Sequence, residues 1–218
     1  ARLFGFNLMQ NFAFPYFSRD IAEFWRRWHI SLSTWFRDYL YIPLGGSHGG
    51  IWMKVRNTFI IFIVSGFWHG ANWTFIVWGA LNAVYFLPLL LRNKNRTNLN
   101  VAAQGQILVT FKEAVQISTT FLLTILAWVF FRAATITDAL SYIYSMLSKS
   151  LFTLPTVDVK PLAFIGLLVL VEWLQRHNQH GLEKVSKSLF IRWSIYALII
   201  FSIILFGAQS QSFIYFQF

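Results

Sequence analysis

The sequence predicts an all-α integral membrane protein that crosses the bilayer several times. Of its 218 residues, 56% are hydrophobic, 19% are aromatic and only 12% are charged, whereas a typical soluble domain is about one quarter charged. Long apolar runs recur along the chain, with polar loops between them. This composition excludes a disordered chain. The absence of cysteine excludes a disulfide scaffold, a thiol nucleophile and a Cys-ligated metal.

The net charge of +10 indicates a membrane surface as partner. In a soluble protein such a charge would point to nucleic acid. Here the basic residues lie mostly between apolar runs, as they do in cytoplasmic loops and in segments that contact anionic lipid head groups. We therefore expect membrane lipids, and no nucleic acid, among the partners.

The first element with chemical interest spans residues 18–42 and is predicted to be one amphipathic helix. Asp20 and Glu23 have the spacing of a capping box, and Pro43 ends the helix. One face carries an aromatic stripe at helical spacing: Trp25, Trp28, His29, Leu32, Trp35 and Phe36. An interfacial helix explains the stripe, but His29 within it must be either a hydrogen-bonded core histidine or a functional group.

The longest uncharged run covers residues 57–91. Its 35 residues would form a helix of about 50 Å, which is too long for one upright crossing of a bilayer core of about 30 Å. We expect it to break around residues 69–72, giving two elements at 57–69 and 72–91 that share a broken or reentrant region.

A polar face crosses this break. Thr58, Ser65, His69 and Asn72 share one side if the helix continues that far. Polar groups in an apolar membrane helix usually face the bundle interior or a wet cavity, and burial favours the neutral imidazole that a general base requires. His69 is thus a candidate general base, or else a histidine that bonds a neighbouring helix or gates a pore.

Three further runs are predicted to be membrane helices, at residues 114–131, 161–174 and 193–208. The second is short, so it is tilted, buried or only partly inserted. His177 and His180 have no carboxylate immediately beside them, so we expect no metal site. The chain contains no P-loop, dinucleotide fingerprint or nucleophile elbow.

Two histidine-bearing motifs carry a resemblance to a known family: FWRRWHISLSTWFRDYLYIPLGGS at residues 24–47 and SGFWHGANWTFIVWGALNA at 65–83. They resemble the membrane-bound O-acyltransferase (MBOAT) family, and most closely its bacterial, alginate O-acetyltransferase-like branch. The resemblance is strong over about residues 5–91. Because family members are longer, it implies that residues 1–218 form a single membrane domain, the C-terminal portion of a helical bundle with broken helices around a tunnel.

The resemblance also implies an activity and a location. It implies a multi-pass enzyme of the bacterial inner membrane that moves an acetyl group from acetyl-CoA or a similar cytoplasmic thioester to hydroxyls of an exported polysaccharide, as in alginate biosynthesis. No bound cofactor is implied. The acceptor polysaccharide and extracytoplasmic acetylation proteins are the implied partners.

The same resemblance assigns roles to residues. His69 matches the catalytic histidine, and His29 matches the second signature histidine. The expected substrate-binding residues are Trp68, Asn72, Ser65, Trp28, Arg26 and Arg27, and the two arginines would meet either donor phosphates or lipid head groups. Two alternatives remain open: D-alanyl or other acyl transfer to teichoic acid or protein, and a transporter or pore without chemistry.

Overall fold

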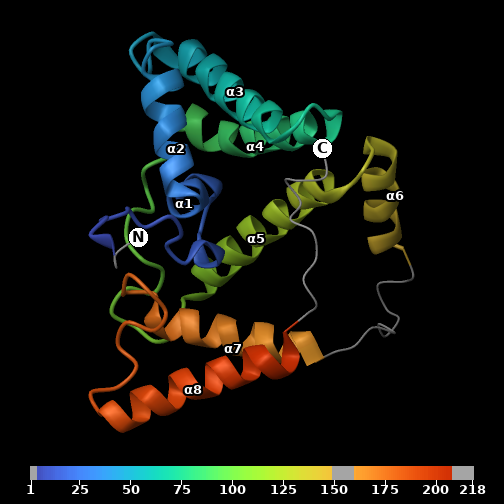
Figure 1. Ribbon diagram of the computed structural model, residues 1–218. Coiled ribbons are helices and arrows are strands. Elements are labelled where there is room, and N and C mark those ends of the chain that lie inside the picture. Colours follow the sequence, from blue (N-terminus) through green and yellow to red (C-terminus); the bar gives the residue numbers. More distant parts are fainter. Residues whose placement is uncertain (1–3, 149–159, 208–218) are drawn as a thin grey trace.

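The computed structural model describes residues 4–148 and 160–207, and the long regular elements in that part of the chain are all α-helices (Figure 1). Four of them are long and apolar enough to cross a membrane: α3 (Gly50–His69), α4 (Trp73–Leu91), α5 (Phe111–Arg132) and α8 (Leu189–Phe206). A shorter apolar helix, α7 (Lys160–Gln175), lies between the last two in sequence. The predicted all-α membrane class is confirmed.

The predicted break in the long apolar run is confirmed. Helix α3 ends at His69, and α4 begins at Trp73 after Asn72, whose Oδ1 accepts a hydrogen bond from the Thr74 amide at 3.1 Å. An N-cap of this kind satisfies a donor that the first turn of a helix cannot pair itself. The predicted start of α3 at residue 57 was wrong, because the helix continues back through Arg56 and Lys54 to Gly50.

Two glycines bring α3 and α4 into backbone contact. A methyl group on Gly66 would lie 2.3 Å from the Phe75 carbonyl oxygen, and one on Gly79 would lie 2.2 Å from that of Phe62. Small residues at a membrane helix interface allow this close approach. His69 lies one turn beyond Gly66, and its ring contacts Phe75 and Trp78 of α4.

The single helix expected over residues 18–42 is not what forms. The chain makes a short 3₁₀ turn, η2 (Pro15–Phe17), then α1 (Ile21–Arg27), α2 (Ile30–Phe36) and a π-helical turn, η3 (Arg37–Tyr41). Between α1 and α2, Trp28 is extended and His29 is left-handed, with φ of 47°. The helical register that placed His29 within one aromatic stripe is therefore interrupted at that residue.

The preceding segment supplies the partners that make this interruption stable. The Ala13 amide donates to the Arg27 carbonyl at 2.9 Å, and the Ile30 amide donates to the Asn11 carbonyl at 2.9 Å. The Asn11 side chain accepts from both the amide and the hydroxyl of Ser31. These long-range bonds replace the ones that a continuous helix would have made, and they offset the cost of the left-handed residue.

The core lies where α4, α5 and a short amphipathic helix, α6 (Ile136–Met146), meet. Trp78, Ala127, Phe130 and Ala139 are buried there. Helix α6 was not predicted, because it lies between the predicted membrane runs at residues 114–131 and 161–174. Thr135 caps its first turn, because the Thr135 hydroxyl accepts from the Asp138 amide at 3.1 Å.

The last two helices, α7 and α8, form an antiparallel pair that Figure 1 shows on the other side of α5 from α3 and α4. The predicted spans at 161–174 and 193–208 correspond to them, although residue 208 lies outside the described residues. Arg176 joins this pair to the segment before α5 by bonding the carbonyls of Ala102 and Ala103. No α8 residue is buried, and its mean hydropathy reaches 2.2, as expected of a surface in contact with lipid.

Candidate active site

A cavity of about 420 Å³ lies among η2, α1, α2, α3, α4 and α5. Its walls are mostly aromatic, and both candidate histidines line it. The lining residues are Tyr16, Trp25, Trp28, His29, Leu32, Ser65, His69, Trp78, Trp128, Phe131 and Arg132. An apolar cavity with a few convergent polar groups is the usual form of a small-molecule site.

His69 is the last residue of α3 and packs among aromatic rings. Its ring lies edge-on to Phe131, at 4.9 Å between centroids, and edge-on to Trp78 at 5.4 Å. Within the described residues its Nδ1 is buried and has no hydrogen-bond partner. Because nearly all buried polar atoms in folded proteins are paired with protein or water, this unpaired imidazole nitrogen on a cavity wall is available to a water or a substrate.

His29 reaches the same cavity from the break between α1 and α2. Its neighbour Trp28 also lines the cavity and is held by ring contacts with Phe24 and Trp128, at 5.6 and 5.2 Å between centroids. The Nδ1 of His29 is likewise buried with no hydrogen-bond partner in the part of the chain that the structure describes. Two unpaired imidazoles therefore line one cavity, although 40 positions separate them in the sequence.

Two hydroxyl groups, of Ser65 and Tyr16, also line the cavity. Ser65 lies one turn before His69 on α3 and is 6% exposed. Tyr16, on η2, was not predicted. Burial raises the pKa of its phenol and the negative charge of Glu172 raises it further, so the hydroxyl stays protonated and can donate a hydrogen bond at neutral pH.

The structure thus brings four of the predicted residues to one cavity: His69, His29, Ser65 and Trp28. Sequence reasoning missed the contribution of α5, which supplies Trp128, Phe131 and Arg132. The available signal was the run WVFFR at residues 128–132, where an aromatic cluster is followed directly by a charge.

The other four predicted residues do not line this cavity. Trp68 is 54% exposed on the outer side of α3, where its ring contacts that of His69. Asn72 caps α4 and donates its Nδ2 to the Ala134 carbonyl at 2.9 Å. It does not continue the polar face of Ser65 and His69, because α3 ends before it.

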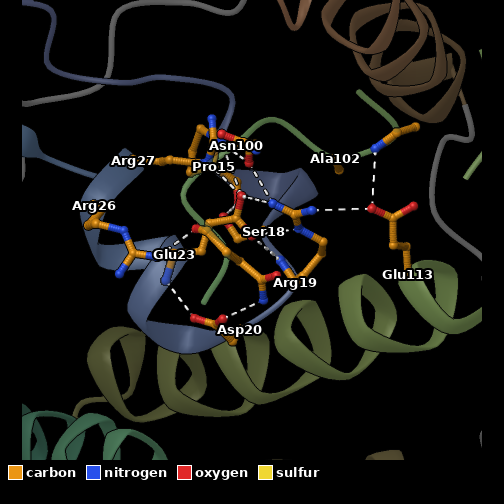
Figure 2. A network of polar contacts seen from close by, with 12 residues as sticks. Pro15, Ser18, Arg19, Asp20, Glu23, Arg26, Arg27, Asn100, Ala102 and Glu113 are labelled. Carbon is orange, nitrogen blue, oxygen red and sulfur yellow. Dashed lines mark hydrogen bonds and ion pairs between the residues drawn. The ribbon is translucent and has the colours of Figure 1, made fainter. Parts of the chain in front are cut away.

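Arg26 and Arg27 lie in a polar network on α1 (Figure 2), and neither lines the histidine cavity. Arg26 donates to the carbonyls of Asn95 and Asn98, at 2.7 and 2.8 Å. Arg27 forms an ion pair with Glu23 at 2.9 Å and also donates to the Asn100 carbonyl at 3.1 Å. Both guanidinium groups therefore hold α1 against the segment that connects α4 and α5.

Glu23 is the centre of this network (Figure 2). Its side chain is 1% exposed and pairs with both Arg19, at 3.0 Å, and Arg27. Arg19 also bonds Glu113, in the first turn of α5, at 3.2 Å. The carboxylate thus fixes α1 relative to α5, the two helices that supply Trp25 and Trp128 to the cavity.

The fold and the cavity define a class: a polytopic helical membrane protein with two unpaired histidines on an aromatic internal surface. Within the described residues, no group of three or more His, Cys, Asp or Glu side chains could hold a metal ion.

Residues 3–101 match the MBOAT, or membrane-bound O-acyltransferase, family. This segment, which contains both histidines, is therefore an MBOAT-family sequence, as the two motifs predict.

Curated relatives agree with this assignment. The chain is 46% identical over 131 residues to the probable alginate O-acetylase of Pseudomonas aeruginosa, covering 60% of this chain and 23% of that protein. It is 38% identical over 169 residues to the probable alginate O-acetylase of Azotobacter vinelandii, covering 78% and 32%. It is also 38% identical over 143 residues to the peptidoglycan O-acetyltransferase of Helicobacter pylori, covering 66% and 26%. The chain therefore spans between about a quarter and a third of the length of these relatives.

Proposed function

We propose that this chain carries the acyl-transfer centre of a membrane O-acyltransferase. The enzyme would move an acetyl group from a thioester donor to a hydroxyl of a cell-envelope polysaccharide. The observation that carries the proposal is the pair of buried, unpaired Nδ1 atoms of His29 and His69 in one aromatic cavity. The family match of the segment containing both residues supports it.

His69 is the proposed general base. Its neutral imidazole takes the proton of the acceptor hydroxyl as the oxygen attacks the thioester carbonyl carbon. The C–O bond forms, the tetrahedral intermediate collapses, and the C–S bond breaks. The imidazolium then returns the proton to the departing thiolate, so the products are an ester and a free thiol. Neither a metal nor a redox partner is needed to balance this step.

His29 and the hydroxyl groups have supporting roles in this proposal. His29 orients the acceptor or donates a hydrogen bond to the thioester carbonyl oxygen, where negative charge develops. Ser65 lies close enough in sequence to His69 to share its face of α3, and an acyl-serine route remains an alternative to direct transfer. The aromatic walls limit access of water, which would otherwise hydrolyse the thioester.

The finer assignments form part of the same proposal, and the names of the relatives support its acetyl group and polysaccharide acceptor. Two relatives are probable alginate O-acetylases and one is a peptidoglycan O-acetyltransferase. We therefore propose acetyl-CoA or a similar acyl thioester as donor, and an exported polysaccharide as acceptor. The proposal also includes extracytoplasmic acetylation proteins as partners and the bacterial inner membrane as location.

The experiment compares two histidine variants of the full-length protein in cells. His69→Ala should abolish acetylation of the envelope polysaccharide, measured by mass spectrometry of the isolated polymer. His48→Ala is the matched control, because His48 is exposed in a turn and lines none of the cavity. Membrane accumulation of both variants should equal that of the wild type. A polymer that carries D-alanine instead of acetyl would show that the transferred group is D-alanyl. Wild-type acetylation by His69→Ala would show that His69 is not part of the mechanism.

A further inference from the structure

Arg132 occupies the point where the histidine cavity meets a second pocket. It is the last residue of α5, and its side chain is exposed. The second pocket, of about 440 Å³, lies between α5 and α6 and is lined by Ile125, Val129, Asp138, Tyr142 and Met146, together with residues around Arg132. Trp128 and Arg132 line both pockets, so they form the wall that the two share.

Within the part of the chain that the structure describes, no carboxylate forms an ion pair with the guanidinium of Arg132. Across residues 4–148 and 160–207 it makes neither a hydrogen bond nor an ion pair. Asp138 lines the second pocket too, but its carboxylate accepts the Thr135 hydroxyl at 2.7 Å at the start of α6. Arg19 and Arg176 differ in this respect, because Arg19 pairs with carboxylates and Arg176 bonds backbone carbonyls.

The surroundings of Arg132 favour an anion as its partner. The pocket between α5 and α6 is lined mainly by apolar side chains, and Arg132 is its basic lining residue. A guanidinium offers a planar fork of donors that matches carboxylate and phosphate oxygens. The phenol of Tyr142, from α6, and the indole of Trp128, from α5, add a hydrogen-bonding group and a flat apolar surface to the same pocket.

Building on the acyl-transfer function proposed above, we propose that Arg132 binds an anionic oxygen group of a substrate beside the histidine cavity. The pocket between α5 and α6 then holds the part of that substrate which carries the anion. The rest of that substrate extends past Trp128, so that its reacting group, the thioester carbon of a donor or the hydroxyl of an acceptor, lies toward His69. The shared chemistry is an oxyanion, which is either a phosphate of the acyl donor or a carboxylate of an acidic sugar acceptor.

A basic residue at the end of a membrane helix can instead simply contact lipid head groups. Arg92 provides the matched control for that role. It is exposed, follows directly after the last residue of α4, and lines none of the pockets described here. A head-group role predicts equal effects at the two positions, whereas substrate binding predicts an effect at Arg132 alone.

The experiment measures equilibrium binding to the detergent-solubilised full-length protein, so it does not depend on turnover. The probes are two matched pairs: coenzyme A against pantetheine, and trigalacturonate against maltotriose. In each pair only the first molecule carries the anion. Wild type, Arg132→Gln, Arg132→Lys and Arg92→Gln are compared, and thermal unfolding of each variant checks that the fold is retained.

We expect Arg132→Gln to weaken one anionic probe by about 10- to 100-fold, the range for loss of a charge-assisted hydrogen bond. The neutral partner probe should bind as before, and Arg132→Lys should lose part of the affinity because it keeps the charge without the fork. Loss for coenzyme A assigns the anion to the donor, and loss for trigalacturonate assigns it to the acceptor.

Three results would overturn the inference: unchanged binding of both anionic probes, an equal loss in Arg92→Gln, or no saturable binding of either anionic probe to the wild type. If the proposed acyl-transfer role of the histidine cavity is wrong, the His69→Ala variant should acetylate the polysaccharide as the wild type does. That result would not change the outcome of these binding measurements.

Discussion

Gly66 of α3 lies directly against the carbonyl group of Phe75 in α4, so that a methyl group at Gly66 would stand 2.3 Å from the carbonyl oxygen. This backbone contact lies one turn before His69 and positions the end of α3 against Phe75 and Trp78. The place of the candidate base thus depends on a residue without a side chain.

Gly66→Ala should therefore damage both stability and activity. The added carbon has to push α3 away from α4, which costs about 1–3 kcal/mol when a packed interface is overfilled, and it displaces the His69 ring from its aromatic contacts. Thermal unfolding of the purified full-length protein and acetyl transfer by the folded fraction would measure the two effects. Gly166→Ala on α7 is the control, since nothing lies within 4 Å of the added carbon there. Equal behaviour of the two variants would show that the α3–α4 contact does not matter.

Removing the charge of Glu23 should be costly. Glu23→Gln leaves Arg19 and Arg27 without the carboxylate that both contact, and breaking a buried ion pair by removing one partner typically costs about 3–5 kcal/mol. Asp38→Asn is the comparison, because the Arg37–Asp38 pair has side chains that are 59% and 42% exposed, and exposed pairs contribute little to stability. Similar free energies of unfolding for the two variants would contradict this interpretation.

Changing Arg27 should lower the stability of the fold and leave donor binding unchanged. Arg27→Lys keeps the charge but loses the set of directed bonds to Glu23, Ala13 and Asn100. We expect lower thermal stability and lower accumulation in the membrane, with an unchanged KM for the thioester in the protein that remains folded. Arg92→Lys should change neither quantity. A raised KM at full stability would instead return Arg27 to a role in binding donor phosphates.

Much of the fold follows from local sequence signals. The break between α3 and α4 was predictable because an uncharged run of 35 residues is too long for one span and contains Gly70 and Asn72 at its centre. The spans at α5, α7 and α8 follow from apolar runs alone. Helix α6 has a local signal as well, in Thr135 and Asp138, but it is too short to appear as an apolar run.

The break at His29 could not be predicted from its own segment. It depends on Asn11 and Ala13, which supply hydrogen-bond partners from an earlier part of the chain. The roles of Arg26 and Arg27 depend in the same way on carbonyls around residues 95–100. Residue type and spacing identified the two histidines, whereas the aromatic wall from α5 is a product of tertiary packing.

The central claim is that His69 removes the proton of the acceptor hydroxyl. It is tested most directly by the acceptor-dependent release of free thiol from an acetyl thioester, measured with the purified full-length protein and its His69→Gln variant. The account predicts a fall of about 10²- to 10⁴-fold in the rate for the variant, the usual contribution of a general base, with thioester binding retained. An unchanged rate in a folded His69→Gln protein would contradict it.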